Sequence, residues 1–155
     1  MDSVDKVIWI LPFLAVMDVA SALYIESQGY SFENYEAGVF ARLFVAYGLA
    51  YVYAFIYPLG VVVLAYVLWS IKRRLSASGS VDKGVFLFLV GVACFIYMRL
   101  TVAFAENLLL PYFISGEVSL TFVTWLLYLS MMLSLGFYIW HDVVIWVRAN
   151  GNHKE

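Results

Sequence analysis

Charged residues are scarce in this chain. Asp, Glu, Lys and Arg together make up 13% of its 155 residues, whereas soluble domains typically carry about 25%. Hydrophobic residues reach 65%, well above the roughly 45–50% of a soluble domain. The composition therefore excludes an ordinary water-soluble domain.

Cysteine and histidine are also nearly absent. The single cysteine, Cys94, excludes a disulfide within the chain. Neither His141 nor His153 lies deep in an apolar run, which argues against a haem held between helices. The sequence contains no Gly-x-Gly-x-x-Gly loop, no Cys-x-x-Cys pair and no His-Cys-carboxylate set with metal spacing. We therefore expect no metal, no cofactor and no nucleic-acid partner.

Long apolar runs dominate what is present. A membrane-spanning helix needs about 20 such residues, and four runs of at least this length occupy most of the chain. We predict an all-α fold, a polytopic membrane protein built as a four-transmembrane-helix bundle, with a single membrane domain over residues 1–155. The predicted spans cover about 7–27, 43–71, 84–110 and 118–141.

The region before the second span needs a break. Residues 34–74 would form a helix of roughly 60 Å, twice the thickness of the hydrocarbon layer. Gly48 and Pro58 are the candidates for a break or a tilt. We favour an interfacial helix over 34–42, followed by a membrane helix that is kinked near Pro58.

Basic residues are distributed unequally between the two ends of the predicted spans. Arg42 is the only basic residue expected on one side, and it lies there among five glutamates. Those on the other side are Lys6, Lys72, Arg73, Arg74, Lys83, Arg148 and Lys154. Because Lys and Arg in short loops mark the cytoplasmic face, we predict a multi-pass protein of the plasma (cell) membrane with both termini in the cytoplasm.

Two charged residues interrupt the apolar spans, Asp18 in the first and Arg99 in the third. An ionisable side chain at that depth costs roughly 3 kcal/mol or more unless it finds a partner or water. The two spans run in the same direction, so we expect Asp18 and Arg99 to meet. The pair would either fix the packing of the first and third helices or form part of an ion or proton site.

Glu106 follows Arg99 by seven residues and therefore shares its helix face. Glu26, Arg42 and Asn107 lie near the same end of the bundle, and with Glu106 they could form the outer rim of a small polar pocket above Arg99. The alternative is that all four residues are ordinary solvated helix ends.

Two further stripes have helical spacing. Ser130, Ser134, Tyr138 and His141 form a polar seam along the fourth span, which we interpret as a packing seam because such hydroxyls usually bond to a backbone carbonyl or a neighbouring helix. Ala46, Ala50 and Ala54 recur every four residues in the second span. Small residues on one face allow another helix to approach closely, within the bundle or from a second copy.

Residues 11–74 contain an Asp in the first span, a Glu-Ala pair and a basic residue before the second span: Asp18, Glu36-Ala37 and Arg42. In these features they resemble an uncharacterised family of small prokaryotic membrane proteins, a domain of unknown function. Ala15, Ala22 and Gly38-Val39 stand where that family has Asn, Thr and Asn-Pro. The resemblance implies a membrane hairpin with a polar feature near Asp18, and it carries no activity.

No set of residues in the sequence has the arrangement of a catalytic site. We therefore expect a non-enzymatic integral membrane protein that acts through helix packing, as a homo-oligomer or as a subunit of a membrane complex, with the lipid bilayer as its other partner. The alternative is a small transporter or an ion or proton channel that uses Asp18, Arg99 and Glu106. A third, more distant interpretation is a lipid-modifying intramembrane enzyme, which would need several polar groups converging at one interface.

Overall fold

A computed structural model describes residues 2–30, 43–44, 46–77, 83–116 and 119–149. Four long helices occupy most of this part of the chain: α1 (Ser3–Ser27), α4 (Ala50–Ala77), α5 (Lys83–Ile114) and α6 (Leu120–Ala149). Each is long and apolar enough to cross a membrane. The prediction of an all-α fold with four helices of membrane-spanning length is confirmed.

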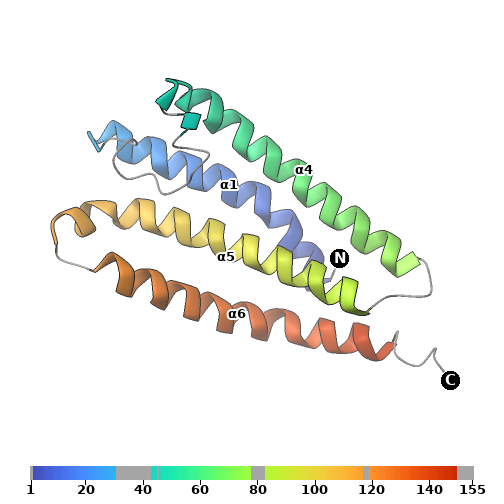
Figure 1. The fold of residues 1–155 in the computed structure, drawn as a ribbon. Coiled ribbons are helices and arrows are strands. Elements are labelled where there is room, and N and C mark those ends of the chain that lie inside the picture. The colour runs from blue at the N-terminus through green and yellow to red at the C-terminus, as the bar shows by residue number, and fades with distance from the viewer. Residues whose placement is uncertain (1, 31–42, 45, 78–82, 117–118, 150–155) are drawn as a thin grey trace.

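The helices run side by side, and α1 lies between α4 and α5 (Figure 1). α6 lies along α5 and also contacts α1. The start of α1 and the end of α6 meet, because the Ser3 amide donates to Asp142 Oδ2 over 2.7 Å. Lys72, near the end of α4, joins them there through Asp2. Successive helices therefore alternate in direction.

Two helical segments end at a glycine whose backbone has the left-handed conformation, with positive φ. Gly29, with φ of 92°, follows α1, and the Tyr30 amide bonds back to the Ile25 carbonyl over 3.3 Å. Gly48, with φ of 69°, is followed by an equivalent bond of 2.7 Å from the Leu49 amide to the Phe44 carbonyl. Both bonds have the pattern of a Schellman motif, which requires a residue with positive φ and so favours glycine.

The break at Gly48 changes the second predicted span. α4 begins at Ala50 instead of residue 43, and Pro58 lies inside it. The sequence named Gly48 and Pro58 as candidates, and the structure interrupts the helix at Gly48, whereas the kink near Pro58 stays a prediction. The interfacial helix predicted over 34–42 lies outside the described residues.

The third and fourth helices are longer than predicted. α5 continues through Pro111 to Ile114, although the predicted span ended at residue 110. Pro111 lacks the amide hydrogen that would bond to the Asn107 carbonyl, but the loss of one bond near a helix end is tolerated more easily than in the middle. α6 continues past residue 141 to Ala149, and its last turns carry Trp146 into the core.

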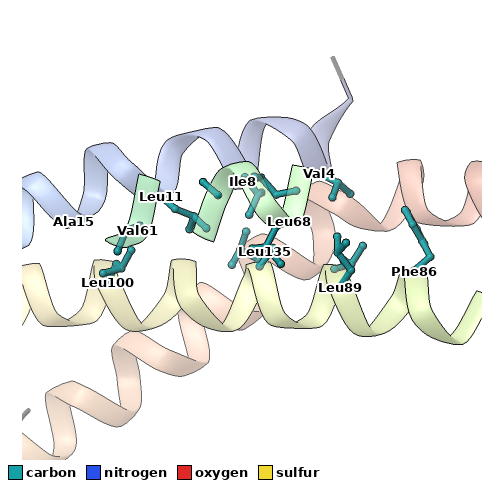
Figure 2. Close-up of a cluster of buried hydrophobic side chains, with 14 residues drawn as sticks. Val4, Ile8, Leu11, Ala15, Val61, Leu68, Phe86, Leu89, Leu100 and Leu135 are labelled. Carbon is teal, nitrogen blue, oxygen red and sulfur yellow. The ribbon is translucent and has the colours of Figure 1, made fainter. Parts of the chain in front are cut away.

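The core follows a seven-residue repeat on the two central helices. In α1 the side chains of Val4, Ile8, Leu11 and Ala15 are buried, at alternating steps of four and three residues. In α5 Phe86, Ala93 and Leu100 are buried at intervals of seven. Figure 2 shows these two rows facing each other, with Val61 and Leu68 of α4 and Leu135 of α6 beside them. α1 and α5 therefore form the most buried contact of the bundle.

α6 is the least enclosed helix. In its most apolar stretch 6% of the residues are buried, compared with 33% in α5 and 28% in α1. Its contacts with the core come mainly from its second half, where Leu135 is buried and Trp146 stacks on Phe86 with ring centroids 3.6 Å apart. The first half of α6 leaves most of its apolar side chains exposed.

Candidate functional site

Asp18 lies where three helices meet. Its carboxylate accepts hydrogen bonds from Asn107 Nδ2 of α5 over 3.0 Å and from the Tyr57 hydroxyl of α4 over 3.3 Å. Asn107 Nδ2 is also 3.2 Å from the Asp18 carbonyl and 3.0 Å from Ser21 Oγ. The Ser21 hydroxyl donates to the Asp18 carbonyl over 2.7 Å. This cluster, called the Asp18 junction below, links α1, α4 and α5 by polar contacts inside an apolar bundle.

The seven-residue repeat places these residues at the junction. Asp18 stands seven residues after the buried Leu11, and Asn107 stands seven after the buried Leu100. Both polar residues therefore continue a buried row of their own helix, on the faces by which α1 and α5 meet. Tyr57 precedes the buried Val61 of α4 by four residues, which also places it on the inner face.

A second polar group lies between α5 and α6. Arg99 Nη1 is 3.7 Å from Glu106 Oε2, and the Thr124 hydroxyl of α6 donates to Glu106 Oε1 over 2.6 Å. The side chain of Arg99 is 43% exposed and that of Glu106 25%. Glu106 of the ion pair and Asn107 of the Asp18 junction are consecutive residues of α5. The two polar groups therefore belong to one region of the bundle.

The structure brings the predicted intramembrane residues into this region, and it gives Asp18 partners other than the expected Arg99. Asp18 binds Asn107 and Tyr57, and Arg99 pairs with Glu106. The direct pairing of Asp18 with Arg99 stays a prediction. Asp18 stands 12 residues after Lys6, whereas its partner Asn107 stands 24 residues after Lys83. The two lysines therefore do not lie at equal distances from the Asp18 junction along α1 and α5.

The predicted outer rim is only partly described. Asn107 is not on a rim, because its amide lies in the Asp18 junction. Glu106 points to Thr124 of α6. Glu26 is half-buried near the end of α1, and Arg42 lies outside the described residues. A shared polar pocket above Arg99 stays a prediction.

The two serines of the polar seam donate hydrogen bonds within α6. Ser130 donates to the Leu127 carbonyl over 3.0 Å, and Ser134 donates to the Ser130 carbonyl over 2.8 Å. Ser130, Ser134, Tyr138 and His141 are all exposed, so the seam lies on an outer flank of α6 in the single chain. His141 Nδ1 is 3.5 Å from Asp142 Oδ1. A packing role for the seam stays a prediction and would require a partner outside this chain.

The alanine stripe is not part of the buried core. Ala46 is exposed and precedes α4, and Ala50 and Ala54 are half-buried. The buried row of α4 lies further along, at Val61, Ala65, Leu68 and Lys72. A close approach at the alanine stripe stays a prediction for contact with a second copy.

A charged cluster that the sequence did not single out lies at the end where α1 begins. Lys72 Nζ is 2.6 Å from Asp2 Oδ2 and 2.6 Å from Asp5 Oδ1. Its side chain is only 7% exposed, because it stands four residues after the buried Leu68 and so continues the inner face of α4. Asp2 also caps α1 by accepting from the Asp5 amide over 2.9 Å. This cluster, the Lys72 clasp, ties α4 to the start of α1.

The chemistry of these sites is that of hydrogen bonding and charge neutralisation. Among the residues that the structure describes, no three His, Cys, Asp or Glu side chains gather into a candidate metal site. The Asp18 junction combines one carboxylate with neutral donors, and it holds no nucleophile beside a histidine base. Its geometry suits the alignment of helices.

The chain was also compared with known proteins. No family model matches it, and no curated protein or solved structure matches it. The resemblance of residues 11–74 to the uncharacterised membrane family therefore stays a prediction.

Proposed function

We propose that this chain is a non-enzymatic integral membrane protein that acts through helix packing, as a homo-oligomer or as a subunit of a larger membrane complex. The observation that carries this proposal is the unequal burial of its helices. α6 has 6% of its most apolar stretch buried, against 33% for α5. Its outer surface presents large rings, including Trp125, Phe137 and Trp140.

The Asp18 junction supports a packing role. Asp18, Asn107 and Tyr57 come from three different helices, and their polar atoms bond to one another. A buried polar group costs free energy unless it is hydrogen-bonded, so such a junction penalises other helix alignments. The Asp18 junction would then hold α1, α4 and α5 in one arrangement, and α6 would pack against the outside of this arrangement.

The mass of the particle in mild detergent or in lipid nanodiscs tests the proposal. We expect a particle heavier than one chain. The variant Phe137→Ala removes an exposed ring from α6 and should lower the mass, whereas Phe55→Ala removes a similarly exposed ring from α4 and serves as the matched control. A strictly monomeric wild-type particle without a co-purifying partner would contradict the proposal.

The same proposal includes a location in the cell membrane with both termini in the cytoplasm. Lys6, Lys72, Arg73, Arg74 and Arg148 support this orientation, because they lie toward the end of the bundle where α1 begins. Single cysteines at Ser76 and Ser115 in a Cys94→Ala background test it. A membrane-impermeant maleimide should label Ser115→Cys on intact cells and Ser76→Cys only after the membrane is opened. The reverse pattern would overturn the orientation.

A second candidate is a small transporter or an ion or proton channel that uses Asp18, Arg99 and Glu106. The exposure of Arg99 favours this candidate. Its side chain is 43% exposed, and a charged side chain in the middle of a span needs water or a polar partner. Flux of protons or potassium into proteoliposomes is the test. Asp18→Asn and Arg99→Ala should each abolish the flux, and unaltered flux in both variants would end this candidate.

A further inference from the structure

Aromatic rings and cations gather between α1 and α4 at the end of the bundle where α1 begins. Trp9 of α1 lies against Trp69 of α4 with ring centroids 5.8 Å apart, and Tyr66 lies 6.1 Å from Trp69. The guanidinium carbon of Arg73 stands 5.4 Å from the centre of the Trp69 ring. Trp9, Tyr66 and Arg73 are exposed, and Trp69 is half-buried. These four residues define the Trp69 cluster.

The three consecutive basic residues of α4 have three different environments. Lys72 is buried and neutralised by Asp2 and Asp5. Arg73 lies over the Trp69 ring, and Arg74 is exposed. Within the described part of the chain, ion pairs involve Lys72, Arg99 and His141 and involve neither of these two arginines. Arg73 is therefore a cation held in place by a ring and not neutralised by a described carboxylate.

A cation–π contact does not use up the N–H donors of a guanidinium. Arg73 has five such donors, arranged in a planar fork that matches the oxygens of a phosphate. Lys6, which is exposed and precedes Trp9 by three residues on α1, adds a second cation to the same end. Charge complementarity therefore favours an anionic occupant that carries phosphate.

The cluster also has the layered order of a lipid–water interface. Trp69 stands four residues before Arg73, roughly 6 Å nearer the middle of the helix, and Tyr66 lies one turn further in. Tryptophan and tyrosine rings favour the headgroup level of a membrane, and basic groups beside them attract anionic lipids. Beyond the rings, Phe13 of α1 and Val62 of α4 expose apolar side chains along which an acyl chain can lie.

We propose that the Trp69 cluster binds the headgroup of an anionic phospholipid, with the phosphate on Arg73 and the glycerol backbone against Trp9 and Trp69. This site is separate from the Asp18 junction and from the outer face of α6. It would give the protein a preference for anionic membrane whether or not it forms oligomers.

Native mass spectrometry of the purified full chain tests this site, with phosphatidylglycerol or phosphatidylcholine as the added lipid. We expect the wild type to retain phosphatidylglycerol over phosphatidylcholine, and Arg73→Gln to lower that preference about fivefold. Arg74→Gln removes the same charge one residue away and should change it less than twofold. Trp69→Leu should lower the preference as Arg73→Gln does, and Trp69→Phe should largely restore it.

Three outcomes would overturn the site. Equal losses in Arg73→Gln and Arg74→Gln would mean that the whole basic end attracts lipid without a defined position. Equal retention of the two lipids by the wild type would remove the preference itself. Displacement of the bound lipid by millimolar inorganic phosphate would show a site for free anions. Circular dichroism of each variant separates loss of lipid from loss of fold, and Trp69→Phe keeps the test valid if Trp69→Leu unfolds.

Discussion

The unit formed by α1, α4 and α5 differs from the flank between α5 and α6 in how each treats polar side chains. In the three-helix unit, Asp18 lies among donors from three helices, and Lys72 is 7% exposed between two carboxylates. On the flank, Arg99 is 43% exposed, and its ion pair with Glu106 spans 3.7 Å.

The apolar side chains follow the same division. Buried rows of α1, α4 and α5 interlock, whereas the first half of α6 contributes little to the core. Asp18 and Lys72 therefore find polar partners within the three-helix unit, while the flank contains an ion pair that is only partly covered. We propose that the three-helix unit acts as a scaffold and that water or a partner would cover the polar side chains left exposed on the flank.

Among variants that test the difference between the three-helix unit and the flank, we expect the largest loss of stability at Asn107. Asn107→Leu removes the donor that reaches the Asp18 carboxylate, the Asp18 carbonyl and Ser21, which should lower the free energy of unfolding by about 2–3 kcal/mol. Unfolding by sodium dodecyl sulfate in mixed micelles measures it. Leu108→Ala, at the next and exposed position, is the control and should cost far less. Equal losses in the two variants would remove the junction from the scaffold.

The Lys72 clasp should have a smaller effect. Lys72→Met leaves Asp2 and Asp5 without their cation, and because Asp2 is 41% exposed we expect a loss of about 1–2 kcal/mol, below the value for a fully buried pair. The same unfolding titration applies. Adding Asp5→Asn to Lys72→Met should recover part of the loss. A double variant less stable than Lys72→Met alone would argue against the clasp as an electrostatic contact.

The smallest effect is expected on the flank. Thr124→Val removes the hydroxyl that donates to Glu106 over 2.6 Å, and interhelical hydrogen bonds in membranes are worth about 0.6 kcal/mol on average. Unfolding measured as for Asn107→Leu should show a loss of that size, with Ser130→Ala on the outer side of α6 as the control. A loss as large as that of Asn107→Leu would break the distinction between scaffold and flank.

The sequence predicted the elements better than their contacts. Asp18 was identified because a carboxylate in an apolar run is conspicuous, but Asn107 was placed on an outer rim because it lies near the end of its predicted span. Its position seven residues after Leu100 was the available signal. Lys72 was grouped with Arg73 and Arg74 as a cytoplasmic charge, although its spacing from Leu68 places it on the inner face of α4.

Composition and periodicity by themselves determined that this chain forms four long apolar helices and which residues share a face of each. Only the tertiary structure decided that Asn107 faces Asp18, that Lys72 is buried and that α6 lies at the periphery. The physical reason is that the helical repeat sets the direction of a side chain around its own axis. The shift of one helix along another depends on the fit of side chains from both.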